Sequence, residues 1–234
     1  MKVFMKIVCW LLIIPVLSLT SGCASYRFGR LPSPYIMDQP GSITQKDVAV
    51  AVKFMSCSEA ETTFDCEMGK RKINPVFIVI ENKSNITYSF RKADIDSSYL
   101  AAEEVVKKCA RSTMGRVATY GLLGLIVIAW IVFIPMAIAE AINCPRINSQ
   151  MRSDYISHEI ADATIAPGRS LNGVMFVAPF RSGEAFNIPL VNRDTGEKLI
   201  FQFQNTQLGA VCVDSKEKKE EPKEKKEPKK NFGP

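Results

Sequence analysis

The residues of this 234-residue chain that could do chemistry are seven cysteines, one histidine and a few adjacent carboxylates. Because His158 is the sole histidine, no His–His metal pair can form, and a histidine triad would need that side chain. No nucleophile lies near His158 in a recognisable arrangement, so we expect this histidine on a helix surface. We also expect the neighbouring pair Glu103 and Glu104 on a helix surface. The motifs of serine hydrolases, zinc peptidases and nucleotide-binding proteins are also absent. The sequence therefore predicts no catalytic residue, metal site or cofactor, and a protein that is not an enzyme.

The N-terminus has the pattern of an export signal. Lys2 and Lys6 precede an apolar stretch from Ile7 to Leu19. This stretch is too short for a stable helix across a bilayer about 30 Å thick. It leads into Leu19-Thr20-Ser21-Gly22-Cys23, which resembles the lipobox of bacterial prolipoproteins.

This resemblance implies that residues 1–22 are removed and that Cys23 is acylated, which anchors the chain to a membrane of the bacterial cell envelope. Thr20 departs from the commonest pattern, in which leucine stands three residues before the cysteine. Ala24 follows, where an aspartate would resemble the inner-membrane retention signal. The resemblance therefore implies an outer-membrane protein facing the periplasm. One alternative is an ordinary signal peptide with a chance cysteine. Another, given the glycosylation sequons at Asn82 and Asn85, is a secreted or single-pass membrane protein of a eukaryote.

Five cysteines remain once Cys23 and the cysteine of the signal are set aside, and an oxidising periplasm would allow them to form disulfides. Cys57 and Cys66 are close enough in the chain for a local loop. Cys109 and Cys144 lie on either side of an apolar segment, and a disulfide between them would hold its two ends together. We therefore expect the bridges Cys57–Cys66 and Cys109–Cys144, and the alternative is a set of unpaired buried thiols.

Most of the remaining chain has the pattern of short strands. Residues 48–54 alternate with period two, 75–80 form a continuous apolar run, and 86–90 follow a turn-prone stretch as the second strand of a hairpin. Three further strands follow, at residues 173–177, 186–191 and 198–203, the last two joined as a hairpin. This pattern predicts a mainly β fold, an antiparallel immunoglobulin-like sandwich with an α-helical hydrophobic insertion, α+β overall.

The insertion covers residues 98–163, with helical patterns at 98–110 and 149–163. Between them, 19 of the 23 residues of segment 117–139 are hydrophobic, and none is charged. As one helix this segment would extend about 34 Å, enough to cross a bilayer. A single crossing would put the strands before and after it on opposite sides of a membrane, however, and the flanking basic residues favour the opposite orientation to the one that lipidation requires.

We therefore favour a helical hairpin that leaves and re-enters the domain on one side, with a true span as the open alternative. Its bend is expected between Trp130 and Pro135. Gly121 and Gly124 belong to a small-residue stripe that lets a second helix approach closely. With Trp130, Phe133 and Pro135 they are the residues that we expect to contact the membrane or a partner.

The net charge of +6 is concentrated at the chain ends. Residues 216–230 hold eight lysines and five glutamates, and the signal holds two further lysines. Residues 23–215 are therefore close to neutral, which gives no support for nucleic-acid binding. The tail at 216–234 has too little apolar content to order itself.

Together these patterns predict six segments, which are a signal peptide (1–22), a lipidated linker (23–45), the first half of the sandwich (46–97), the helical insertion (98–163), the second half (164–215) and a disordered tail (216–234). The predicted function is that of a lipid-anchored envelope protein used as a structural or interaction module. Its partners would be the membrane, through Cys23, and a second copy or another envelope protein. The alternative is an oligomeric or membrane-spanning component of an export or channel assembly.

Overall fold

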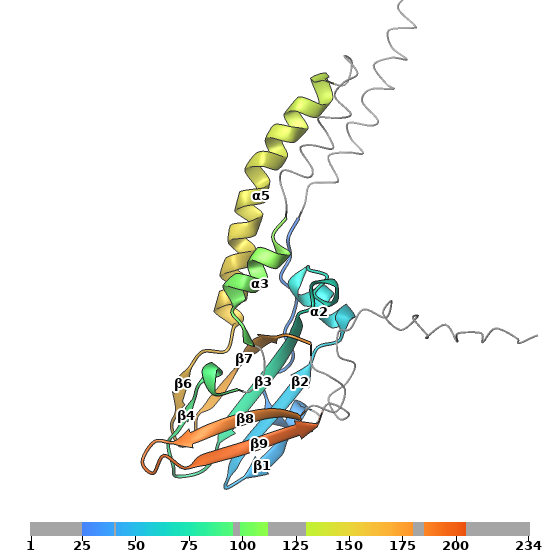
Figure 1. Cartoon of the computed structure of the whole chain (residues 1–234). Helices are drawn as coiled ribbons and strands as arrows, with labels where there is room; N and C mark the ends of the chain where they lie inside the picture. Colours follow the sequence, from blue (N-terminus) through green and yellow to red (C-terminus); the bar gives the residue numbers. More distant parts are fainter. Residues whose placement is uncertain (1–24, 40, 96–98, 112–129, 180–184, 205–234) are drawn as a thin grey trace, which may run out of the picture.

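The computed structural model describes residues 25–39, 41–95, 99–111, 130–179 and 185–204, with the backbone alone for 130–142. Within these ranges the chain is mainly β, with two antiparallel sheets and a group of helices at one end (Figure 1). The strands are β1 (Ile43–Gln45), β2 (Val48–Phe54), β3 (Asn74–Asn82), β4 (Tyr88–Phe90), β5 (Tyr99–Leu100), β6 (Ala163–Ile165), β7 (Ser170–Val177), β8 (Ala185–Asn192) and β9 (Lys198–Gln204). The helices are α2 (Cys57–Phe64), α3 (Ala102–Cys109) and α5 (Trp130–His158), with short 3₁₀ turns at Ile36–Asp38 (η1), Gly69–Arg71 (η2) and Lys92–Asp94 (η3).

Both sheets combine strands from before and after the helical insertion. The first sheet has the order β1-β2-β3-β7-β5 and the second the order β6-β4-β8-β9. β3 pairs with β2 on one side and with β7 on the other, in register from Asn74↔Val177 to Glu81↔Ser170. β4 likewise pairs with β6 and β8. Neither sheet can therefore be completed by one half of the chain alone.

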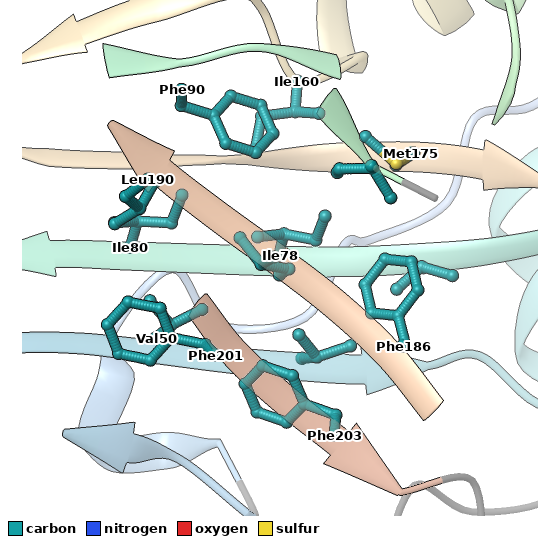
Figure 2. Close-up of a cluster of buried hydrophobic side chains, with 14 of the residues drawn as sticks. Val50, Ile78, Ile80, Phe90, Ile160, Met175, Phe186, Leu190, Phe201 and Phe203 are labelled. Atoms are coloured by element: carbon teal, nitrogen blue, oxygen red, sulfur yellow. The ribbon is translucent and has the colours of Figure 1, made fainter. Parts of the chain in front are cut away.

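The main core lies between the two sheets. Alternate side chains of β2 and β3, among them Val50, Ile78 and Ile80, face side chains of β8 and β9 such as Phe186 and Phe203 (Figure 2). Every second residue of β9 is buried and the others are exposed, as its period-two pattern requires. The core is therefore built from the inward faces of two strand layers.

A second core covers the other face of the first sheet. The side chains of Phe77 and Val79 on β3 and Phe176 on β7 pack against α2, α3 and the C-terminal half of α5. Both faces of β3 are thus buried, which explains its continuous apolar sequence. The centre of this contact is Phe64, whose ring lies 5.2 Å from that of Tyr155 and 5.4 Å from that of Phe176.

The predicted strands at residues 48–54, 75–80, 173–177, 186–191 and 198–203 are confirmed, as is the hairpin that joins β8 and β9. The predicted hairpin between residues 75–80 and 86–90 is wrong, because β3 and β4 belong to different sheets. The buried Asn82 side chain explains the crossing. Its Nδ2 donates to the carbonyls of Ile86 (2.7 Å) and Ile165 (3.0 Å), which turns the chain towards the second sheet.

The bend predicted between Trp130 and Pro135 is also wrong. α5 is one continuous helix from Trp130 to His158, and Pro135 is the sixth of its residues. Pro135 lacks the N–H that would pair with the Ile131 carbonyl, and the helix continues past it on the hydrogen bonds of the neighbouring turns. In the part of the chain that the structure describes, no helix is both long and apolar enough to span a bilayer.

Gly173 allows the chain that leaves α5 to lie directly on β7. A Cβ atom there would meet Cα of Ile160 at 2.6 Å and its backbone nitrogen at 2.8 Å. That nitrogen donates a 2.9 Å hydrogen bond to the carbonyl of Val174.

We expect Gly173→Ala to lower the free energy of unfolding by about 2 kcal/mol, because backbone must shift to admit the methyl group. Urea unfolding would measure this loss of stability. The matched control is Asn172→Ala at the exposed neighbouring position, which we expect to change the free energy of unfolding by less than about 0.5 kcal/mol. Equal effects of the two substitutions would contradict the packing argument.

Candidate functional site

Several predicted site residues fall on segments whose placement is not described. Cys23, Gly121 and Gly124 lie outside the described residues. Trp130, Phe133 and Pro135 belong to the first turns of α5, of which only the backbone is described. The membrane or partner contacts predicted for these residues therefore stay predictions.

The cysteines pair differently from the prediction. Cys66 is bonded to Cys109, so the expected bridges Cys57–Cys66 and Cys109–Cys144 are both wrong. Cys57 is also disulfide-bonded, and Cys144 is buried in α5. The bridge joins the chain just after α2 to the last residue of α3. It therefore fixes two helices of the second core to each other.

Immediately beyond this bridge, Arg111 joins three distant parts of the chain. Its Nη2 donates to Oδ2 of Asp65 (2.8 Å) and to the carbonyl oxygen of Ser25 (3.2 Å). Its backbone N–H donates to Oδ1 of Asn148 on α5 (3.0 Å), and Asn148 Nδ2 donates back to the Arg111 carbonyl (3.3 Å). We call this contact the Arg111 junction. Nothing in the sequence singled out Arg111 or Asn148 for this role.

The junction places three chain positions at one end of the domain, which we call the anchor pole. Ser25 is the second residue after Cys23, Arg111 is the last described residue before segment 112–129, and Asn148 lies on the helix that follows that segment. In Figure 1, α5 extends away from the sheets at this same end. The insertion therefore leaves and re-enters the domain beside the start of the described chain.

His158 lies at the last turn of α5, as predicted for a helix histidine. Its ring stacks on Phe28, with centroids 4.3 Å apart, and its Nδ1 lies 2.8 Å from the carbonyl oxygen of Asp154. The Ser157 hydroxyl is 3.1 Å from the same Nδ1, which the sequence pattern did not reveal. The Ser157 hydroxyl donates its proton to the Asp154 carbonyl, which is the same oxygen that lies next to His158 Nδ1. Both side chains therefore bond to a carbonyl of the last turn of the helix.

A half-buried polar cluster holds the C-terminal end of α5 to the edge of the first sheet. The Tyr99 hydroxyl donates to Glu159, whose carboxylate also accepts the Ala102 N–H (3.2 Å) and lies 3.3 Å from Lys92 Nζ. Burial and the hydrogen bond to Glu159 raise the pKa of Tyr99. Burial alone would lower the pKa of Lys92, but its bonds to Tyr99 and Glu159 raise it above the ordinary value. The groups satisfy one another, so this cluster is structural.

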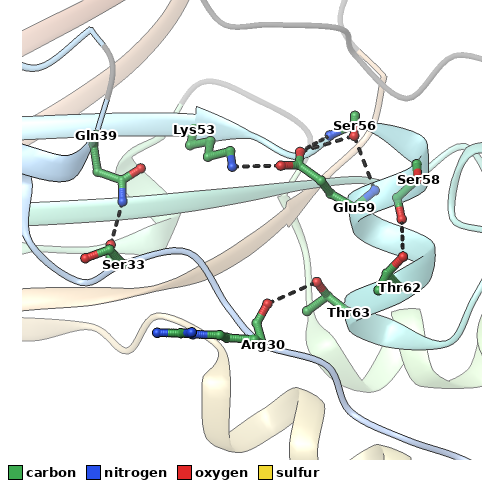
Figure 3. Close-up of polar contacts among 9 residues, drawn as sticks. All are labelled: Arg30, Ser33, Gln39, Lys53, Ser56, Ser58, Glu59, Thr62 and Thr63. Carbon is green, nitrogen blue, oxygen red and sulfur yellow. Dashed lines mark hydrogen bonds and ion pairs between the residues drawn. The ribbon is translucent and has the colours of Figure 1, made fainter.

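A pocket of about 300 Å³ lies between the N-terminal segment, β2 and α2. Ser56 and Glu59 form a capping box at the start of α2, and Lys53 Nζ lies 2.8 Å from the Glu59 carboxylate (Figure 3). The hydrogen bonds from Lys53 and from the Ser56 backbone lower the pKa of Glu59. On the opposite wall, the Thr63 hydroxyl donates to the Arg30 carbonyl at 3.4 Å. The ammonium group of Lys53 and the carboxylate of Glu59, which both line the pocket, are thus engaged with each other.

Two further features bear on binding and modification. The Asn82 side chain is fully buried and donates two hydrogen bonds, so the glycosylation sequon at Asn82 is not accessible in the folded domain. Among the described residues, no three His, Cys, Asp or Glu side chains are grouped so as to hold a metal ion.

Comparisons with family models, with curated proteins and with solved structures each found no match to this chain. No family can be assigned.

Proposed function

We propose that this protein is a lipid-anchored component of a bacterial cell envelope, acylated at Cys23 and held at the outer membrane on its periplasmic face. The observation that carries the proposal is the Arg111 junction. It brings Ser25, two residues after Cys23, to the point where the apolar insertion leaves the domain. The lipid and the insertion would therefore meet the same membrane.

The disulfide content supports export. Stable disulfides form in oxidising compartments such as the bacterial periplasm and are rare in the cytosol. Cys66, Cys109 and also Cys57 are disulfide-bonded in this domain. Because the export signal precedes these cysteines in the chain, their disulfides would form after the protein has crossed the inner membrane.

The sheet pairing supports an insertion that returns to the side from which it left. A single crossing by segment 117–139 would separate β2, β3 and β4 from β6, β7, β8 and β9 by a bilayer. These strands instead pair with one another, β3 with β7 and β4 with β6 and β8. The arrangement favours a re-entrant or hairpin insertion over a single span.

For the domain itself we propose an immunoglobulin-like arrangement that serves interaction and not catalysis. β2, β3 and β7 would take the places of strands A, B and E, and β4, β6, β8 and β9 those of C, C′, F and G. The strand orders within both sheets support this assignment. The helical insertion would then lie between C and C′, and a domain of this kind would present its surface to another envelope protein.

Substitution of Cys23 tests the lipid anchor. In the source bacterium, we expect Cys23→Ala to abolish incorporation of labelled fatty acid, because the acceptor thiol is removed. Ala24→Asp is the matched control. It leaves the thiol in place, so labelling should continue, while the protein should shift to the inner-membrane fraction. Wild-type protein that takes up no label, or a Cys23→Ala variant that is labelled as strongly as wild type, would refute the proposal.

A further inference from the structure

The near-neutral domain has a strongly uneven distribution of charge. Four segments meet at the anchor pole, residues 25–27, 65–72, 103–111 and 144–152, and they hold nine basic and four acidic residues. The loops at the opposite end, residues 45–47, 81–87, 166–169 and 192–198, hold five basic and four acidic residues. The positive charge of the folded part is therefore gathered beside the chain position that follows Cys23.

The contacts between these segments place them around one centre. Arg71 donates to the carbonyl of Lys108, which brings the loop after η2 to the end of α3. Arg111 then connects the end of α3 to Ser25 and to Asn148, as described above. The loop, the end of α3, the N-terminal segment and α5 thus lie next to one another at the anchor pole.

All four acidic residues of the anchor pole are already paired. They form ion pairs that use up four of the nine basic residues: Asp65–Arg111, Glu67–Lys70, Glu103–Arg152 and Glu104–Lys108. Four other basic side chains are exposed and have no ion pair among the residues that the structure describes: Arg27, Lys72, Lys107 and Arg146. We call these four the basic collar.

We propose that the basic collar binds the anionic headgroups of the membrane that receives the Cys23 lipid, and so holds the domain upright on its anchor. The inference rests on the proposed lipid anchor. Exposed lysines and arginines attract negative phospholipids when they lie within a Debye length, about 8 Å, of the lipid surface. Because the four residues come from four different segments, their contacts with the membrane would also resist tilting of the domain.

Lysine acylation of the reconstituted, full-length lipoprotein tests this proposal. The protein is incorporated into vesicles of phosphatidylcholine alone or of phosphatidylcholine with phosphatidylglycerol, and labelling of individual lysines is followed by mass spectrometry. We expect Lys72 and Lys107 to react about threefold or more slowly in the anionic vesicles, while Lys83 and Lys198 at the opposite end react equally in both. High salt should remove the difference, because it screens exposed charges.

A charge reversal supplies the matched comparison. Arg146→Glu should weaken the protection of Lys72 and Lys107, whereas Arg193→Glu, the same change at the opposite end, should leave it intact. Vesicle flotation is recorded in every sample. Failure of the wild-type protein to float would count against the lipid anchor itself. If the protein floats but Lys72 and Lys107 are labelled equally in both kinds of vesicle, the collar proposal is overturned while the lipid anchor stands. The same conclusion holds if labelling of all four lysines slows equally in the anionic vesicles.

Discussion

Replacing both Cys66 and Cys109 by alanine should lower the free energy of unfolding by about 4 kcal/mol. The bridge closes a loop with a sequence separation of 43 residues, and the chain-entropy model assigns a loop of this length about that stabilisation. Domains of this size have a total stability of only about 5–15 kcal/mol, so the loss is a large fraction of it. Urea unfolding of the oxidised proteins, followed by circular dichroism, measures the difference.

The double substitution is preferred to a single one because it leaves no new thiol to form incorrect bridges. Lys53→Ala, which removes a partly exposed ion pair and keeps every disulfide, serves as a control with an expected loss of less than about 1 kcal/mol. If the double variant unfolded within about 1 kcal/mol of wild type, the bridge would not be the main connection between α2 and α3.

Phe64→Ala should cost about 3–5 kcal/mol, because it empties the centre of the second core. The Phe64 ring is fully buried and makes edge-to-face contacts with Phe28, Tyr155 and Phe176. Ring pairs of this kind add about 0.5–1.5 kcal/mol each to the effect of burial. Loss of the ring should therefore loosen α2 and α5 from the first sheet together.

The Tyr155→Phe variant separates packing from hydrogen bonding at the same contact. It keeps the ring and removes only the hydroxyl, which donates to the Phe64 carbonyl at 2.7 Å. We expect it to cost about 1 kcal/mol, much less than Phe64→Ala. Thermal or urea unfolding of both variants gives the comparison, and a larger loss for Tyr155→Phe would mean that the hydrogen bond, not the aromatic cluster, holds the helices.

The strands were predictable because burial leaves its period in the sequence. β9 alternates between buried and exposed residues. β2 alternates valine with alanine although both of its faces are buried. β3 is uniformly apolar because the second sheet covers one of its faces and the helices cover the other. The partner of β3 was not predictable from these features, because apolar content does not specify which sheet a following strand joins. In the folded chain, the Asn82 side chain holds the turn into the second sheet through hydrogen bonds to the carbonyls of residues 4 and 83 positions away.

The Cys57–Cys66 bridge was mispredicted because nearness in sequence was taken for nearness in space. Cys57 begins α2 and Cys66 lies two residues beyond its end. A helix of eight residues separates its ends by about 12 Å, too far for a bridge. The capping box of Ser56 and Glu59 is a sequence signal that could have revealed this helix.

The anchor pole could not be read from the sequence in the same way. Arg111, Asn148 and Ser25 carry no motif, and only the folded chain brings them together. The basic collar was hidden for a related reason. Net charge is summed along the chain, and residues 23–215 sum to nearly zero although the positive charges gather at one end.

The pairing of β3 with β7 also has a consequence for the order of events as the protein is made. The two strands are about ninety residues apart in the chain, and the whole helical insertion lies between them. A chain that emerges N-terminus first has neither sheet complete until β7, β8 and β9 have followed, so its early segments stay unfolded with apolar strands exposed. The growing chain would therefore expose apolar strand surface until its last strands arrive, which is the condition under which chaperones protect a protein from aggregation.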